Sequence, residues 1–252
     1  MKSKNKNTSS SLKDRKSTGQ ESHITKFGQS TELRFGGFMI GKEDIEIAIG
    51  INDRLPSNDV LRVTELTGCF MRPIIERKEK IRFKPNDAML QGTLFHAFIP
   101  KIIKANKEQY PNPQYEVEGT MDCEDEFGKF KIIGHCDVLL DNKILEFKYS
   151  KTTYPLNIGY LLQCNFYCEL FNRDSCDLIT VDKETNDVTC KEIKKNKESI
   201  DLIIYLAKQM RRILFDKEII DSSIYENMFC GKCQYKKQCK KYSKSTVLSE
   251  KI

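Results

Sequence analysis

The sequence lacks three features that would each decide a class of protein. No run of 18 apolar residues occurs among its 252 residues, so no segment predicts a membrane-spanning helix. No tandem repeat is visible, so one main core is expected. The first residues are basic and polar with no apolar segment behind them, a pattern that does not predict a secretory signal. We therefore expect a cytoplasmic protein with no membrane partner.

A phosphate-loop site is also missing one required group. Residues 36–43 read GGFMIGKE and match the spacing of a phosphate-binding loop. Glu43 stands where such a loop places a Ser or Thr hydroxyl on magnesium, and the interior of the stretch is apolar. The sequence therefore excludes a nucleotide site here.

Charge is unevenly distributed along the chain. Lys and Arg number 42 against 36 Asp and Glu, a net charge of +6, and both ends are more basic than the middle. Such a distribution suits a nucleic-acid partner and equally suits solvated tails. Residues 1–30 are polar, rich in Ser and Lys and without periodicity, so we expect a disordered basic arm. A single domain over 31–245 and a short tail at 246–252 complete the expected organisation.

Hydrophobic periodicity predicts a mixed α/β fold in which helices flank a central mixed sheet. Apolar residues recur four apart at Leu90, Leu94, Phe98 and Ile102, which indicates a helix packed on a core, ending or kinking around Pro100. Alternating segments between turn residues indicate strands. The expected helices cover 56–80, 86–107, 155–171 and 197–215, and the expected strands cover 115–125, 129–140, 143–150, 176–181 and 188–193.

Two acidic residues approach each other if the chain reverses at residues 141–142, an Asp-Asn pair. Asp and Asn tolerate the positive φ angles that a two-residue hairpin loop requires. Leu140 then opposes Lys143, residues whose numbers sum to 283 pair across the hairpin, and Asp137 lies opposite Glu146. Directly opposed Cβ atoms are about 4.5–5.5 Å apart, and like charges at that spacing destabilise a sheet. A compensating positive charge is therefore expected.

Lys148 lies on the strand face that carries Glu146, because side chains alternate along a strand. Two carboxylates and an ammonium on one patch favour magnesium or manganese, with the lysine beside a phosphate or an attacking water. Such an arrangement cleaves phosphodiesters. The alternative is a solvent-facing strand in which Lys148 neutralises Glu146, and this is the commoner case for an isolated short motif.

Two helices supply further candidate residues. Gly92 and His96 lie on one helical face, so an imidazole projects beside a position that leaves room for a metal or a backbone. A lone helical histidine is more often a surface or core residue than a ligand. Gln163 and Tyr167, with Tyr160 earlier on the same helix, form a polar and aromatic strip suited to phosphate and base, which alone would be attributed to packing.

The ten cysteines divide into scattered residues and one cluster. Cys136, Cys164 and Cys168 lie in apolar segments and suit a core in a reducing compartment. The stretch CGKCQYKKQC at 230–239 separates three cysteines by two and then five residues, which is typical of thiolate ligands. Three thiolates do not complete a tetrahedral site, so a fourth is required, and spacing alone does not separate zinc from an iron-sulfur cluster.

The motifs G-x-x-x-H, G-x-x-D, E-x-K and Q-x-x-x-Y, in this order, resemble the RecB-like branch of the PD-(D/E)XK nuclease superfamily. With the cysteine cluster behind them, the chain resembles the fourth CRISPR-associated protein family, RecB-like exonucleases with an iron-sulfur cluster. The likeness spans about Cys69 to Cys239 and implies a restriction-endonuclease-like core. It assigns the fourth thiolate to Cys69, so that the cluster would clip the N-terminal helical region onto the C-terminal tail. The implied ligands of a [4Fe-4S] cluster are Cys69, Cys230, Cys233 and Cys239.

The resemblance also implies roles at the nuclease site. Magnesium or manganese would be bound by His96, Asp137, Glu146 and the carbonyl of Phe147, Lys148 would position or activate water, and Gln163, Tyr167 and Tyr160 would hold substrate. The implied activity is metal-dependent cleavage of DNA, commonly single-stranded, from an end. In CRISPR systems such an enzyme trims spacer precursors alongside integrase proteins.

Two departures from the family keep other assignments open. CFMRP at 69–73 replaces the Cys-Pro-Arg common after the first cluster cysteine, and the basic arm is not a core feature of the family. A related nuclease of DNA repair or of viral recombination is therefore an alternative. A non-enzymatic nucleic-acid-binding protein built on a four-cysteine zinc module is the alternative from another class. The sequence leaves the oligomeric state open.

Overall fold

A computed structural model describes residues 33–35, 38–40, 57–81, 86–151, 157–216 and 233–243, with the backbone alone at 33–35, 38–40, 216 and 240–243. The chain divides into two units, Met1–Lys42 and Glu43–Ile252. The arm expected at 1–30 and the tail expected at 246–252 lie outside the described residues. The single domain expected over 31–245 stays a prediction.

The first unit contains a short antiparallel pair. β1 (Leu33–Phe35) pairs with β2 (Phe38–Ile40), with Leu33 opposite Ile40. β2 occupies the interior of the GGFMIGKE stretch. A strand therefore stands in the part of the motif where a phosphate-binding protein has a loop.

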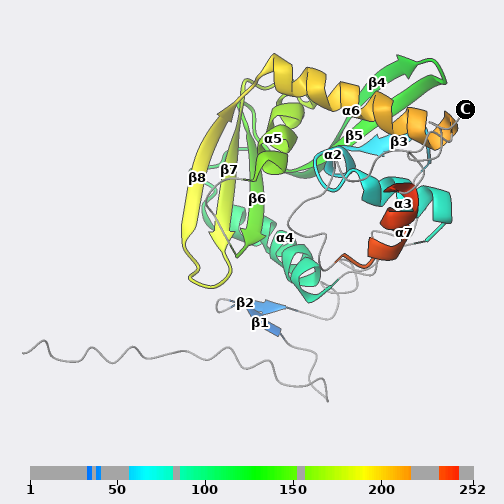
Figure 1. The fold of residues 1–252 in the computed structure, drawn as a ribbon. Helices are drawn as coiled ribbons and strands as arrows, with labels where there is room; N and C mark the ends of the chain where they lie inside the picture. Colours follow the sequence, from blue (N-terminus) through cyan, green and yellow to red (C-terminus); the bar gives the residue numbers. More distant parts are fainter. Residues whose placement is uncertain are drawn as a thin grey trace, which may run out of the picture. The chain divides into compact units, whose positions relative to one another are not determined.

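The second unit is built on a six-stranded mixed sheet (Figure 1). Its strands are β3 (Val60–Arg62), β4 (Gln114–Asp125), β5 (Gly128–Leu139), β6 (Ile144–Ser150), β7 (Ser175–Asp182) and β8 (Val188–Lys194). β5 is central, because β4 runs antiparallel along one side of it while β3, parallel, and β6, antiparallel, share the other side. β7 joins β6 in parallel and β8 joins β7 antiparallel. The mixed sheet predicted from the sequence is confirmed.

Helices cover both faces of this sheet. They are α2 (Val63–Leu66), α3 (Met71–Glu79), α4 (Asp87–Ala105), α5 (Ile158–Leu170), α6 (Lys197–Asp216) and α7 (Lys236–Ser243). α4 packs on one face of β6, where the ring of Phe95 stacks on Tyr149 with 5.1 Å between centroids. α5 lies on the other face, where Gln163 reaches Glu146. In the described part of the chain, no helix is both long enough and apolar enough to cross a membrane.

Local signals explain where the two site-bearing helices begin. The side-chain oxygen of Asn86 accepts a hydrogen bond from the backbone N–H of Met89, and that of Asn157 accepts one from Gly159. The sequence predicted an end or a kink around Pro100; an end is wrong, because α4 continues to Ala105, and a kink stays a prediction. Ile99 and Ile103 on either side of the proline are each 1% exposed, so their packing holds the helix together across the missing hydrogen bond.

The hairpin between β5 and β6 has the predicted register. Val138 pairs with Leu145 and Leu139 with Ile144. The backbone N–H of Leu140 donates to the carbonyl of Lys143 at 2.9 Å. All three pairs obey the sum of 283, so an even-length turn at residues 141–142 sets the relation between the strands, as the sequence predicted.

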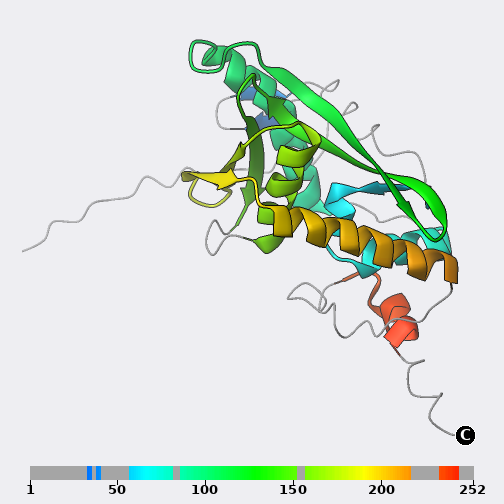
Figure 2. The same ribbon diagram turned by 90° about the horizontal axis from the view of Figure 1, so that it is seen from above.

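A buried arginine ties α6 to the tip of the β4–β5 hairpin, which lies beside the end of that helix (Figure 2). The Arg211 side chain is fully buried, and its guanidinium donates to Asp125 Oδ2 at 2.7 Å and to Asp59 Oδ1 at 2.7 Å. The same group lies over the rings of Phe130 at 4.6 Å and Phe215 at 5.0 Å. Three segments of the chain therefore meet at one side chain.

Replacing Arg211 with Ala should lower the free energy of unfolding by about 3 kcal/mol, because it leaves the buried Asp125 carboxylate without its partner. Urea denaturation measures this change. Arg212→Ala is the matched control, since Arg212 pairs with Glu126 on the surface and should change stability by no more than about 0.5 kcal/mol. Equal effects of the two substitutions would contradict a structural role for Arg211.

Candidate active site

Asp137 and Glu146 follow the last pair of the β5–β6 ladder, Val138 with Leu145, and the direct opposition of the two acids stays a prediction. The side chain of Asp137 is here hydrogen-bonded to the neighbouring strand, since its Oδ2 accepts from the backbone N–H of Phe147 at 2.7 Å. Asp137 is 6% exposed and Glu146 is 1% exposed. Both carboxylates are therefore held at the sheet and removed from water, which is costly for charged groups unless other charges compensate.

Glu146 is held by two neighbours, one from β6 and one from α5. Its Oε1 accepts hydrogen bonds from Lys148 Nζ at 2.6 Å and from Gln163 Nε2 at 2.9 Å. Gln163 Nε2 also lies 2.8 Å from Tyr167 Oη, within hydrogen-bonding distance. The ammonium of Lys148 lies over the ring of Tyr160, 5.2 Å from its centroid. The polar and aromatic strip that the sequence predicted therefore lies on α5, and its residues contact Glu146 and Lys148 of β6.

The second carboxylate oxygen of Glu146, Oε2, takes no part in this hydrogen-bond network. Glu146 Oε2 is buried and has no hydrogen-bond partner among the described residues. Burial, together with the negative charge of Asp137, raises the pKa of Glu146 to about 7 although Lys148 opposes the shift. A buried carboxylate oxygen without a partner is well suited to bind a divalent cation.

His96 reaches the site from α4. Its Nδ1 lies 2.8 Å from Asp137 Oδ1, and its side chain is 29% exposed. Burial alone would lower the pKa of His96, but the hydrogen bond and the charge of Asp137 outweigh it and raise the pKa. One turn earlier, a Cβ built at Gly92 would meet no atom within 4 Å. The space that the sequence suggested beside the imidazole is therefore present.

Glu116 is a site residue that the sequence analysis missed. It lies in β4, and its carboxylate comes close to His96 and Asp137, with one ligand atom from each of the three residues within 4.8 Å of the others. Desolvation and the charge of Asp137 raise its pKa. The signal that could have found it is the register of the β4–β5 hairpin. If that register continues through Glu116, the residue lies opposite Asp137.

Two sets of candidate metal ligands result. The group that could hold a metal ion among the described residues is His96, Glu116 and Asp137. The predicted ligand set instead combines His96 and Asp137 with Glu146, whose Oε1 is occupied by Lys148 and Gln163. Its Oε2 still fits a cation, so binding by Glu146 stays a prediction.

Several predicted substrate and ligand residues are packed inside the protein. Tyr167 is 1% exposed and Gln163 is 5% exposed, and their contacts support Glu146. A Cβ at Gly134 would lie 2.6 Å from Cε1 of Tyr167, so the ring requires a glycine beneath it. Contact of Gln163, Tyr167 and Tyr160 with substrate, and coordination by the Phe147 carbonyl, stay predictions.

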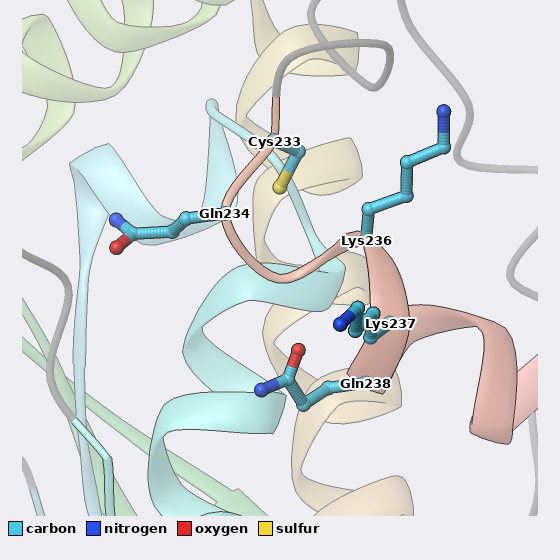
Figure 3. Close-up of a pocket in the computed structure, with 5 residues that line it drawn as sticks. All are labelled: Cys233, Gln234, Lys236, Lys237 and Gln238. Atoms are coloured by element: carbon cyan, nitrogen blue, oxygen red, sulfur yellow. The ribbon is translucent and has the colours of Figure 1, made fainter.

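The described cluster cysteines lie at two helices that touch. Cys69 precedes α3, whose Glu76 accepts a hydrogen bond from Tyr235 Oη at 3.2 Å, and Cys239 lies in α7. Figure 3 shows Cys233 in the turn before α7, with its side chain inside the turn and that of Lys236 directed away. Cys69, Cys233 and Cys239 are half-buried, and Cys230 lies outside the described residues.

Comparison with known proteins bears on the fold. No family model matches the sequence, and no curated protein matches it. The crystal structure of SSO0001 is similar, with a TM-score of 0.56 and 20% identity over 77% of this chain and 93% of that chain. A putative exonuclease from Eubacterium rectale gives 0.46 at 13% identity over 72% and 89% of the two chains. The alkaline exonuclease LHK-Exo from Laribacter hongkongensis gives 0.43 at 15% identity over 63% and 89%. The likeness to SSO0001 shows a shared fold, whereas scores under 0.5 do not establish one.

Gly92→Ala tests whether this glycine has a packing role. Because the added methyl group meets open space, the substitution should raise the free energy of unfolding by about 0.5–1 kcal/mol, the usual cost of glycine in a helix. Gly134→Ala should instead destabilise the protein, since its methyl group would collide with Tyr167. Urea midpoints of the two variants compare these effects, and destabilisation by Gly92→Ala would show that the glycine is needed for the fold.

Proposed function

We propose that the protein is a metal-dependent DNA nuclease, acting as an exonuclease on single-stranded ends. The observation that carries the proposal is the convergence of Asp137, Glu146 and Lys148 in one buried patch with His96 beside it. Glu146 Oε2 and the group around Asp137 fit a divalent cation. When bound there, magnesium or manganese supplies a Lewis acid for the phosphate and lowers the pKa of bound water.

Lys148 is a fixed positive charge in this proposal. Burial would lower its pKa, but the charges of Glu146 and Asp137 outweigh burial and raise it. The side chain therefore stays an ammonium at neutral pH and is a poor general base. Held by Glu146 at 2.6 Å, it is suited to orienting a phosphate oxygen or a water and to stabilising negative charge that develops there.

The residues behind the patch keep it in place. Gln163 and Tyr167 fix Glu146 from α5, and the backbone N–H of Phe147 fixes Asp137. Reacting groups held in one geometry lower the entropic cost of an in-line displacement. The net charge of +6 favours a polyanionic substrate.

A non-enzymatic binding module explains these buried groups less well. Electrostatic binding of nucleic acid needs exposed Lys and Arg, and a carboxylate pair at the sheet adds nothing to it. Removing two carboxylates from water costs free energy that a chemical function would justify. The zinc-module alternative therefore accounts for the cysteines but leaves Asp137 and Glu146 without a purpose.

Asp137→Ala and Lys148→Ala should each lower cleavage of end-labelled single-stranded DNA by about a hundredfold or more, because each removes a group that acts on the reacting phosphate. The assay is run with manganese, and both end labels report the direction of cutting. Lys151→Ala is the matched control, since Lys151 is an exposed lysine that pairs with Glu184. Undiminished cleavage by the purified Asp137 or Lys148 variant would overturn the proposal.

We also propose that Cys69, Cys230, Cys233 and Cys239 hold a structural [4Fe-4S] cluster. The contact of Tyr235 with Glu76 supports this, because it brings α7 against the helix that follows Cys69. Four thiolates suit such a cluster, and a clip between distant segments restricts the unfolded chain. The resemblance further favours spacer-precursor processing with integrase proteins over a repair or viral role.

Metal analysis of anaerobically purified protein should find about four irons per chain and a brown colour. Cys233→Ser should lose iron and lower the thermal midpoint, while Cys190→Ser should keep both, since Cys190 is an exposed cysteine in β8. About one zinc per chain without colour would show a zinc site instead. Retention of iron and of the thermal midpoint by Cys233→Ser would remove this cysteine from the site.

A further inference from the structure

Three glycines determine how closely α5 approaches its neighbours, and two of them lie in the sheet. Gly119 of β4 and Gly134 of β5 are paired across the two strands. A Cβ at Gly119 would lie 2.8 Å from Cζ of Phe171, at the end of α5. One at Gly134 would lie 2.6 Å from Cε1 of Tyr167. The second half of α5 therefore packs on a part of the sheet that carries no side chains.

The third glycine, Gly159, lies in the first turn of α5 and is buried. A Cβ there would lie 2.3 Å from the backbone oxygen of Thr67, the residue that ends α2. Favourable contacts between an aliphatic carbon and a carbonyl oxygen are about 3.3–3.6 Å long. Any side chain at position 159 would therefore require the two backbones to separate by about 1 Å.

The turn at Thr67 is firmly attached to the sheet. Its backbone N–H and its Oγ1 both donate to the carbonyl of Val63, each at 3.0 Å. Val63 is fully buried and directly follows β3, which pairs with the central strand β5. A side chain at position 159 would therefore displace the start of α5 rather than the turn.

The first turns of α5 carry the groups that contact Glu146 and Lys148. Gln163 lies one turn after Gly159, about 6 Å along the helix axis, and donates to Glu146 Oε1 at 2.9 Å. The ring of Tyr160 lies 5.2 Å from the ammonium of Lys148. Hydrogen bonds of this type span only about 2.7–3.2 Å, so a displacement of about 1 Å would break the contact with Glu146.

We propose that Gly159 is a positioning residue of the active site. Its close approach to Thr67 places α5 so that the helix holds Glu146 and Lys148 in their working geometry. The proposal rests on the proposed nuclease function. A misplacement of about 1 Å, even from a change outside the chemistry, lowers a rate by up to about a hundredfold. Gly159 thus matters for turnover beyond its contribution to stability.

Gly159→Ala and Gly119→Ala separate positioning from stability. Both added methyl groups collide with a neighbour, so both variants should unfold at lower urea concentrations than wild type. Only Gly159→Ala should lower kcat for cleavage of single-stranded DNA with manganese, by about tenfold or more, with KM within about threefold of wild type. Gly119→Ala is the matched control, because the end of α5 that it displaces lies about 10 Å along the helix from Gln163. Rates are measured below the unfolding transition of each variant.

A second pair of variants loosens a helix start without any collision. The side-chain oxygen of Asn157 accepts from the backbone N–H of Gly159 at 2.8 Å, and at the start of α6 that of Asn196 accepts from Ser199 at 2.8 Å. Each Asn→Ala change removes one helix cap and should lower the urea midpoint to a similar extent. Asn157→Ala should also lower kcat, by about threefold or more. Asn196→Ala should leave kcat unchanged, since none of the predicted site residues lies in α6.

A measurement that needs no cleavage follows the hydrogen bond itself. In proton–nitrogen NMR correlation spectra, the side-chain amide signals of Gln163 are assigned by their loss in Gln163→Leu. These signals should move in the two variants at the start of α5 and stay in place in the two controls, because only the former change the distance to Glu146.

Wild-type kcat in a folded Gly159→Ala variant, or an unmoved Gln163 signal, would overturn the proposal. An equal fall of kcat in Gly119→Ala would also overturn it, since lost stability would then explain the effect. If Gly159→Ala does not fold, Asn157→Ala decides by the same criteria. If the wild type cuts no DNA, the nuclease proposal fails, and the Gln163 signal alone decides whether Gly159 positions α5.

Discussion

Burial of two like charges between helical layers is the constraint on which the rest of the second unit depends. Asp137 and Glu146 are nearly inaccessible to water, so each must find its donors inside the protein. The neighbouring strand supplies Phe147 N–H, α5 supplies Gln163, and α4 supplies His96. The helices on the two faces of the sheet therefore also supply hydrogen-bond partners, His96 from α4 and Gln163 from α5, which stabilise the buried acid pair.

The charged-strand alternative raised by the sequence is half right. Lys148 does pair with Glu146, as a neutralising surface lysine would. The strand does not face solvent there, however, because the two side chains are 14% and 2% exposed. A surface pair of this kind contributes little and has no chemical use, whereas a buried one fixes a charge in a set position. Burial, which the motif alone does not encode, is what distinguishes the two cases.

Local geometry determined what the sequence could predict. The register of β5 with β6 follows from a two-residue turn, and the facing of Gly92 with His96 and of Gln163 with Tyr167 follows from the helical repeat. Glu116 could not be found in this way, since its place depends on a separate strand pairing and on a left-handed backbone that glutamate rarely adopts. The burial of Tyr167 on Gly134 likewise depends on how closely α5 approaches the sheet.

Arg211, which bonds the tip of the β4–β5 hairpin, affects the order in which parts of the chain fold during synthesis. Arg211 joins residues as far apart in sequence as 152 positions, because it bonds both Asp59 and Asp125 from near the end of α6. Contacts between segments so far apart in sequence form late, because most of the polypeptide must first emerge from the ribosome. The tip of the long β4–β5 hairpin is therefore fixed to α6 only at a late stage, so a chain that ends before Arg211 would lack this contact.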